Sequence, residues 1–271
     1  MELRRNFPEK SVATWPLLSG GYAACRPRLL GALMALLLIW TAPAVANAER
    51  VQLELVLAVD VSLSVNAEEY DLQIQGLANA FRHEAVAAAI RSAGDDGIAV
   101  TLLQWSDNNQ QRIAVDWMHI ADQADATLFA AKVATSPRLF PGDGTAITRA
   151  LESSIAVFGL NEFVGDRRVI DLSGDGVDNR GPTPRTWRDF AVNAGITVNG
   201  LAILNEQDNL DLYYRENVIG GTGAFVMVAE DYYDFADAIL RKLIREISAA
   251  PVASSPTTAP SISVVQRRPQ N

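Results

Sequence analysis

The chain has 271 residues, of which 49% are hydrophobic, and its formal charge is −9 at neutral pH. This length and hydrophobic content predict a sizeable α/β domain with a large buried core, and they disfavour disorder throughout. Residues 1–48 hold five basic and two acidic residues, so the rest of the chain carries a charge of −12. A nucleic-acid partner is therefore disfavoured, because phosphates are bound by Lys and Arg.

The N-terminal segment has the features of an export signal. Arg26 and Arg28 precede an apolar run of 12 residues, and Ala46-Asn47-Ala48 fits the small-x-small pattern that a signal peptidase recognises. The run is short for a membrane span, which needs about 20 residues. An uncleaved N-terminal anchor is the alternative, and it is the only membrane contact that we expect. We interpret residues 1–48 as a signal peptide and predict a periplasmic or secreted protein.

From residue 51 onward, apolar strand-like runs alternate with amphipathic helical stretches. Residues 51–59 begin with alternating hydrophobicity and end fully apolar, as a central parallel strand does. Asn66 and Glu69 form a capping-box pattern ahead of a helix with apolar residues at helical spacing. A second strand is predicted at 98–105, and a turn signal then allows 112–115 to return antiparallel as a hairpin.

The rest of the pattern continues the alternation of helices and strands. Such alternation implies a mostly parallel central sheet with helices on both faces, and the hairpin adds one antiparallel edge strand. We predict a three-layer, Rossmann-like α/β domain at 49–250 and a disordered tail rich in Pro, Ser and Thr at 251–271. The further elements expected are helices at 122–134, 145–158, 184–194, 209–218 and 232–248, and strands at 169–172, 196–204 and 224–228.

Polar side chains follow the first strand, a Gly-rich loop and a later strand. Asp60, Ser62 and Ser64 follow the first strand, and alternate residues of an extended segment point the same way. Thr145 lies at a predicted helix start, and Asp175 follows a later strand. Ligands of open parallel sheets bind outside the carboxyl ends of the strands. Because these loops offer oxygen ligands and neither His nor Cys, they favour Mg²⁺, with Mn²⁺ or Ca²⁺ as alternatives.

Together these motifs resemble the metal-ion-dependent adhesion site (MIDAS) of von Willebrand factor type A (vWA) domains. The resemblance covers roughly residues 51–249. More narrowly, Val-Asp-Val-Ser and Ser-Gly-Asp-Gly-x-Asp-Asn resemble a family of exported bacterial vWA-like proteins with no assigned function. The resemblance implies a vWA fold and an open metal coordination position that a carboxylate of the partner fills. It also implies direct metal ligation by Ser62 and Ser64, ligation by Thr145 in some states, and ligation by Asp60 and Asp175 directly or through water.

One loop departs from the family pattern, and some polar residues near the motifs have simpler interpretations. The usual Thr-Asp-Gly is replaced by Ser173-Gly174-Asp175-Gly176, and the additional Gly is expected to make this loop more pliable. Asp143 is interpreted as a turn residue or as a second acceptor beside the metal, and Asp178 as part of a polar surface loop. Of the pairs Tyr213-Tyr214 and Tyr232-Tyr233, one ring each is expected in the core.

We predict an exported, metal-dependent binding module of the adhesion type, without enzymatic activity, for a protein or peptide partner that offers a carboxylate. The alternative is a Mg²⁺-dependent hydrolase or phosphoryl-transfer enzyme with Asp60 as nucleophile. Against it, Ser62 stands where haloacid dehalogenase phosphatases need a second Asp, and the motif loops contain no Lys. A third possibility is a metal-free structural module, in which Ser62 and Ser64 only satisfy backbone groups at a helix start.

Overall fold

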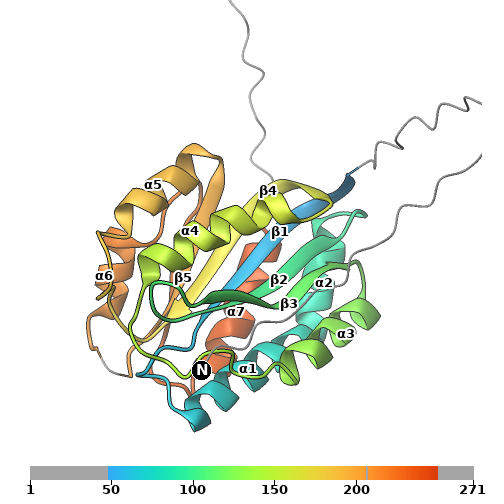
Figure 1. Ribbon diagram of the computed structural model, residues 1–271. Helices are drawn as coiled ribbons and strands as arrows, with labels where there is room; N and C mark the ends of the chain where they lie inside the picture. Colours follow the sequence, from blue (N-terminus) through green and yellow to red (C-terminus); the bar gives the residue numbers. More distant parts are fainter. Residues whose placement is uncertain (1–47, 206, 250–271) are drawn as a thin grey trace, which may run out of the picture. The chain divides into compact units, whose positions relative to one another are not determined.

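A computed structural model of the protein describes residues 48–205 and 207–249. They contain a six-stranded sheet in the order β3-β2-β1-β4-β5-β6, drawn in Figure 1. Every neighbouring pair is parallel except β2 and β3, which pair antiparallel. The mostly parallel sheet with one antiparallel edge strand is therefore confirmed. The strands are β1 (Glu49–Asp60), β2 (Ile98–Trp105), β3 (Gln111–Ile120), β4 (Phe163–Gly174), β5 (Ile196–Ile203) and β6 (Val226–Ala229).

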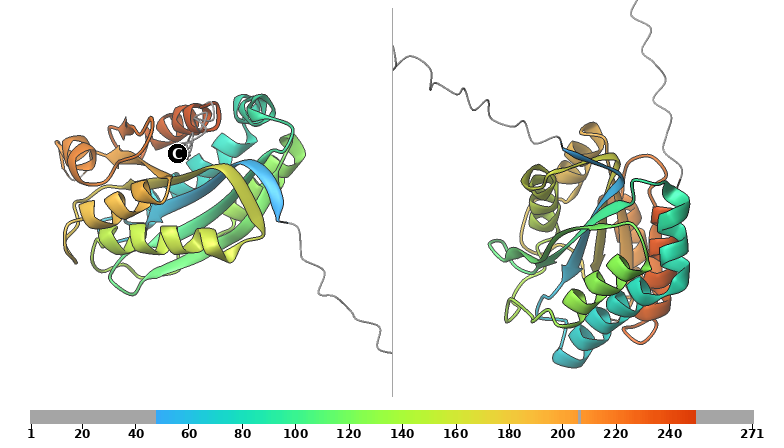
Figure 2. Two further views of the ribbon diagram at one scale, coloured as in Figure 1. Left: turned by 90° about the horizontal axis from the view of Figure 1, so that it is seen from above. Right: turned by 90° about the vertical axis from the view of Figure 1, so that its right-hand side faces the viewer.

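Helices cover both faces of this sheet, which gives the three layers that the sequence predicted (Figure 2). The two faces hold separate hydrophobic clusters, because alternate side chains of each strand point to opposite sides. One face carries α1 (Ala67–Arg82), α2 (Glu84–Ala93), α3 (Gln123–Ala134) and α7 (Phe235–Ile247), and the other carries α4 (Ile147–Val157), α5 (Arg185–Asn193) and α6 (Leu210–Asn217), with a short 3₁₀ turn, η1 (Phe158–Leu160), after α4.

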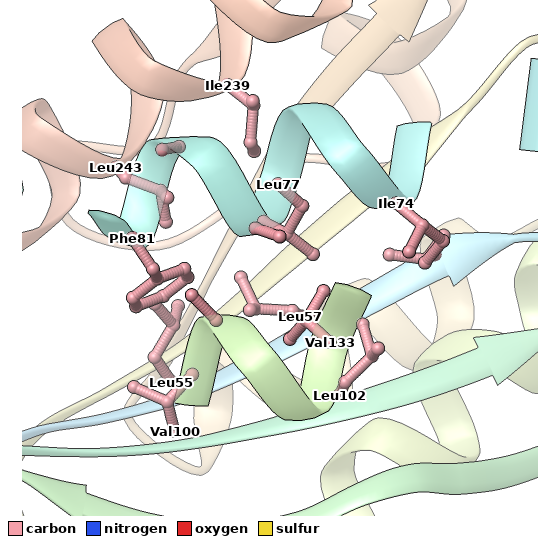
Figure 3. Close-up of a cluster of buried hydrophobic side chains, with 14 of the residues drawn as sticks. Leu55, Leu57, Ile74, Leu77, Phe81, Val100, Leu102, Val133, Ile239 and Leu243 are labelled. Carbon is pink, nitrogen blue, oxygen red and sulfur yellow. The ribbon is translucent and has the colours of Figure 1, made fainter. Parts of the chain in front are cut away.

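The capping box predicted at the start of α1 is present. Asn66 Oδ1 accepts a hydrogen bond from the backbone N–H of Glu69 at 3.0 Å, and Glu69 Oε2 accepts one from the N–H of Asn66 at 2.8 Å. This fixes where α1 begins and therefore how the loop after β1 enters the helix. The apolar side of α1, with Leu77 and Phe81, packs against β1, β2, α3 and α7 (Figure 3).

Two elements differ from the prediction. Helix α2 was not predicted, because no Gly or Pro separates it from α1; His83 ends α1 and its side chain accepts from the N–H of Ala85 to begin α2. Strand β4 begins at Phe163 and is longer than predicted, because charged residues on its partly exposed first half hide the strand pattern. The predicted signal peptide (apart from Ala48) and tail lie outside the described residues. None of the helices in the described ranges is long and apolar enough to cross a membrane.

Candidate metal centre

The motif residues lie in three loops: the first follows β1 and holds Ser62 and Ser64, the second precedes α4 and holds Thr145, and the third follows β4 and holds Asp175. Residues of the first and third loops meet at one edge of the sheet, where the parallel strands end. Strands β1 and β4 lie side by side and parallel, with Val59 opposite Ser173, so their carboxyl ends coincide (Figure 1). Asp60 ends β1, and Asp175 follows the last residue of β4. The side chains of Asp60 and Asp175 are fully buried, although Asp60 is the last residue of its strand and Asp175 is the first residue of a loop.

A short chain of hydrogen bonds joins the two loops. The hydroxyl oxygens of Ser62 and Ser64 are 3.1 Å apart, and Ser64 Oγ donates to Asp175 Oδ1 at 2.7 Å. The other carboxylate oxygen of Asp175 accepts from the hydroxyl of Tyr232 at 3.1 Å. Asp60 Oδ1 accepts from the backbone N–H of Ser62 at 2.7 Å. The structure therefore brings Asp60, Ser62, Ser64 and Asp175 together at the carboxyl ends of two parallel strands.

Asp60 also has a carboxylate oxygen, Oδ2, that is buried and has no hydrogen-bond partner among the described residues. Its backbone carbonyl accepts from Gln73 Nε2 at 2.9 Å, which ties α1 to the end of β1. A Cβ placed on Gly174 would lie 2.9 Å from Asp60 Oδ2 and 2.8 Å from the hydroxyl of Tyr214. A larger residue at position 174 would therefore collide with the buried carboxylate.

Two hydrogen bonds to Asn179 hold the backbone of Thr145 beside the third loop. Its N–H donates to Asn179 Oδ1, its carbonyl accepts from the N–H of Asn179, and both bonds measure 3.0 Å. A Cβ on Gly176 would be 3.6 Å from Thr145 Oγ1, so this hydroxyl lies against the turn that follows Asp175. The second loop also packs on the first, because a Cβ on Gly142 would be 2.9 Å from the backbone of Ser62. All three motif loops thus meet.

Two acidic residues near the site have defined partners. Asp178 Oδ2 accepts from the N–H of Thr148 in the first turn of α4 at 2.6 Å, so it stabilises the start of this helix as well as lying in a loop. Asp143 pairs with Arg180, whose nitrogens lie 3.0 Å from Asp143 Oδ1 and 3.1 Å from Asp107 Oδ1. The sequence led us to interpret Asp143 as a turn residue or as a second acceptor beside the metal. Neither interpretation included its ion pair with Arg180.

The electrostatics of the site favour a cation. Burial, followed by the charge of Asp175, raises the pKa of Asp60 well above its usual value. Burial also raises the pKa of Asp175, although hydrogen bonds from Ser64 and Tyr232 oppose the shift. None of the ion pairs formed within 48–205 and 207–249 includes either acid. Two buried carboxyl groups beside converging hydroxyls, with one oxygen unpartnered, fit a hard divalent cation.

The described residues contain no group of three or more His, Cys, Asp or Glu side chains that could hold a metal. Of the residues brought together at this edge, only Asp60 and Asp175 are acidic, and Ser62, Ser64 and Thr145 carry hydroxyls. Sequence reasoning missed Tyr232 as a partner of Asp175. The prediction that one ring of its Tyr pair is in the core is correct, since Tyr232 is 2% exposed and Tyr233 is 72% exposed.

The additional Gly of the third loop does not loosen it. Gly174 is the last residue of β4 and pairs with Ala202 of β5. The loop therefore begins only at Asp175, whose carboxylate is held from two sides by Ser64 and Tyr232. The additional Gly thus lies in the sheet and not in the loop to which the sequence assigned it, and close packing there requires a small residue.

Comparisons with known proteins place the chain in a structural context. The model of a family described as "Protein of unknown function (DUF1194)" matches residues 50–251. No curated protein matches the sequence. Proximal thread matrix protein 1 from the mussel byssus superposes with a TM-score of 0.55 at 16% identity, over 74% of this chain and 47% of the mussel chain. A further structure of the mussel protein has a zinc-occupied MIDAS motif.

Two bacterial structures show the same likeness. The pilus adhesin SpaC from Lactobacillus rhamnosus GG has a TM-score of 0.54 at 14% identity, over 73% of this chain and 31% of the adhesin. A von Willebrand factor type A protein from Catenulispora acidiphila has a TM-score of 0.51 at 16% identity, over 73% and 43% of the two chains. The chain spans less than half the length of each of these proteins. At such identities the likeness shows the fold alone, and the fold is that of vWA domains.

Proposed function

The chain belongs to the family described as "Protein of unknown function (DUF1194)", and from its vWA fold we propose that it is an exported, metal-dependent binding protein. The observation that carries this proposal is the meeting of Asp60, Ser62, Ser64 and Asp175 at one edge of the sheet. Among the described residues neither acid forms an ion pair, and Arg138 nearby donates to the carbonyls of Val61 and Ser62. The fold neighbours include an adhesin and a byssus matrix protein, which supports a binding role outside the cytoplasm.

We assign the residues of the candidate metal centre as follows. Asp60, Ser62, Ser64, Thr145 and Asp175 would hold a divalent cation, Mg²⁺ in the first instance and Mn²⁺ or Ca²⁺ as alternatives. Asp175 accepts the hydrogen bond from the Ser64 hydroxyl, so the oxygen of Ser64 keeps a lone pair for a cation. When bound, the cation would supply a Lewis acid that attracts a carboxylate of a protein or peptide partner, because hydroxyl ligands leave much of its charge uncompensated.

The same arrangement supports binding more strongly than catalysis. Asp60 and Asp175 would both be committed to the cation, so an enzyme acting at this edge would need a further general base, such as a histidine, within hydrogen-bond reach. Both histidines are engaged elsewhere: His83 accepts from the N–H of Ala85 at the start of α2, and His119 lies 3.3 Å from Glu49 and 2.9 Å from the carbonyl of Asp96. We therefore propose a binding protein without enzymatic activity.

The test is thermal unfolding of the full chain, first in chelator and then in millimolar Mg²⁺, Mn²⁺ or Ca²⁺. A ligand that binds only the folded state stabilises it by about 2.7 kcal/mol at a hundredfold excess over its dissociation constant. Ser62→Ala should lose this stabilisation. The matched control is Ser92→Ala, whose hydroxyl only bonds the carbonyl of Ala88 on an exposed side of α2 and which should keep it.

Two results would contradict the proposal. One is an unfolding midpoint that no ion raises in the parent protein. The other is a metal-induced rise that Ser62→Ala retains in full, because the ion would then bind elsewhere. If the rise depends on Ser62, binding of Asp-containing peptides and of their Asn-containing counterparts should be compared in Mg²⁺ and in chelator. A carboxylate-dependent partner should prefer the Asp peptide, and only in the presence of the metal.

A further inference from the structure

A cavity lies at the opposite end of the sheet from the metal centre. It has a volume of about 450 Å³, within the range of roughly 300 to 1,000 Å³ that is typical of small-molecule sites. Its wall is formed by the first half of β4, the start of β5, the loop before β6 and the end of α7. The residues of the wall that matter for binding are Arg167, Val169, Thr197, Asn199, Phe225 and Glu246.

Arg167 is a partly buried cation that forms no ion pair with any acid in the described part of the chain. Its two terminal nitrogens donate to the carbonyls of Glu246 and Ile247 at 3.0 and 3.1 Å, which leaves three of its five N–H donors. Burial lowers the pKa of Arg167, although the nearby Glu246 opposes the shift. A guanidinium in this setting gains from an anion beside it.

The acids around the cavity do not supply that anion. Asp166 pairs with Arg50 at 2.8 Å, and Asp171 lies 2.6 Å from the fully buried ammonium of Lys242. Glu246 is 1% exposed, and burial followed by the charge of Asp171 raises its pKa to about 8, against the opposing effect of Lys242. The carboxyl group of Glu246 is directed at Lys242 and Asn199, whose nitrogens lie 2.5 and 2.8 Å from its Oε1, and it forms no ion pair with Arg167.

The donors and the apolar wall together define a ligand class. Arg167 offers hydrogen-bond donors, whereas the hydroxyl of Thr197 already donates to the carbonyl of Thr222 at 3.4 Å. Arg245 adds positive charge nearby, because its guanidinium carbon lies 3.8 Å from the ring centroid of Phe225. Phe225 and Val169 supply an apolar surface. The planar fork of a guanidinium pairs with a carboxylate through two parallel hydrogen bonds, so a carboxylate fits the remaining donors of Arg167. We propose that this cavity binds a small organic carboxylate, with its charged group on Arg167 and its apolar part against Phe225 and Val169.

The experiment titrates the full, ¹⁵N-labelled chain with benzoate, and in parallel with benzamide, which has the same shape and no charge. Chelator is present throughout, because the cavity shares no residue with the metal centre and its test must not depend on that site. Benzoate should shift the amide resonances of Thr197, Asn199, Phe225 and Glu246 in a saturable way. Benzamide should bind at least tenfold more weakly.

Variants connect the shifts to the cavity. Arg167→Gln should weaken benzoate binding at least tenfold, whereas Arg91→Gln, on the exposed side of α2, should leave it unchanged. Because Arg167 also holds the end of α7, a second variant, Thr197→Leu, fills the cavity without removing the guanidinium and should block binding too. The proposal is overturned if benzoate shifts these amides no more than benzamide does. It is also overturned if both cavity variants bind benzoate as the parent does.

Discussion

At the scale of single residues, Gly174 shows how tightly the metal centre is packed. A Cβ at this position would meet the hydroxyl of Tyr214, the free oxygen of Asp60 and the ring of Trp105, at 2.8, 2.9 and 3.2 Å. All three side chains are fully buried, so none can move into solvent to make room. The glycine that interrupts the usual family motif is therefore required by its surroundings.

We expect Gly174→Ala to lower the free energy of unfolding by about 1 to 3 kcal/mol, the usual range for overpacking a core. It should also reduce the metal-induced stabilisation, because the carboxylate of Asp60 must shift. Urea denaturation in chelator and in Mg²⁺ measures both effects. Gly159→Ala is the control, since a Cβ there meets nothing within 4 Å. Equal effects of the two substitutions would show that the packing around Gly174 is not limiting.

Tyr232 gives a second prediction at this scale. Tyr232→Phe removes the hydroxyl that donates to Asp175 and leaves a buried carboxylate oxygen without that partner. We expect a loss of about 1 to 3 kcal/mol in chelator, as measured by urea denaturation. Tyr233→Phe should cost less than about 0.5 kcal/mol, because this side chain is 72% exposed. A Tyr232 variant as stable as the Tyr233 variant would contradict the assigned hydrogen bond.

The sequence could predict the site residues that directly follow strands. It could not predict Tyr232 and Gln73, which reach the site from other elements. Asp60, Ser62 and Ser64 were predictable because alternate residues after a parallel strand share one side and one sheet edge. The hydrogen bond from Tyr232 to Asp175 spans 57 positions, and the bond between the side chain of Gln73 and the carbonyl of Asp60 depends on the angle at which α1 packs. No local pattern encodes such contacts.

At the scale of elements, α7 is fixed to the sheet by buried charges as well as by apolar packing. Lys242 is fully buried, and its ammonium lies 2.6 Å from Asp171 of β4 and 2.5 Å from Glu246 one helical turn later. Asn199 of β5 donates to the same oxygen of Glu246 at 2.8 Å. The helix therefore has one defined position along the strands.

Lys242→Met should destabilise the protein by about 3 to 5 kcal/mol, because it leaves a buried carboxylate on Asp171 without its cation. Arg241→Met, the neighbouring substitution on the exposed side of α7, should change stability by less than about 0.5 kcal/mol. Chemical denaturation of the two variants at neutral pH makes the comparison. A small loss for Lys242→Met would contradict the idea that its ion pair with Asp171 fixes α7 to the sheet.

Glu246 predicts a dependence of stability on pH. Its folded pKa of about 8 lies above the ordinary value of 4.5, so the folded state holds this proton more tightly than the unfolded state does. The stabilisation is complete below pH 4.5 and is lost as the pH rises towards 8. Glu246→Gln cannot ionise, so its stability relative to the parent should increase by more than about 1 kcal/mol between pH 5 and pH 8.

Urea denaturation of the parent and of Glu246→Gln at several pH values measures this difference. Glu84→Gln, on the exposed first turn of α2, is the control and should show no such trend. A difference between parent and Glu246→Gln that stays constant over this range would contradict the raised pKa.

The boundaries of elements were less predictable than their order. Helix α2 escaped prediction because α1 and α2 meet at His83 without a Gly or Pro between them. The first half of β4 escaped because Arg167 and Arg168 interrupt the apolar pattern, although both residues pair in register with β1. In each case tertiary contacts decide the structure where the local pattern is weak.

At the scale of the whole domain, one sheet couples two hydrophobic clusters. Leu55 and Leu57 of β1 belong to the cluster under α1 and α7, whereas Val56 and Ala58 belong to the cluster under α4. Because β1 contributes to both clusters and pairs with β2 and β4, neither side can lose its packing alone. The domain should therefore unfold as one cooperative unit.

Leu77→Ala tests this coupling, because Leu77 belongs only to the first cluster. The substitution should lower the free energy of unfolding by about 2 to 5 kcal/mol. Far-UV circular dichroism reports all elements, whereas near-UV circular dichroism reports fixed rings such as Trp105 in the second cluster. We expect both signals to shift together to a lower urea midpoint. Separate midpoints would show that the two sides of the sheet unfold independently.

Strand β1 begins and helix α7 ends at the same edge of the sheet, far from the metal centre. Glu49 of β1 pairs with Phe163 at the start of β4, and the carbonyl of Ile247 in α7 accepts from Arg167 nearby. A linker attached before β1 or after α7 would thus leave the metal-binding edge facing outward. On a sensor chip, immobilisation through either point should preserve ligand access, whereas coupling through the β2–β3 turn at Asp107, beside Arg180, should block it.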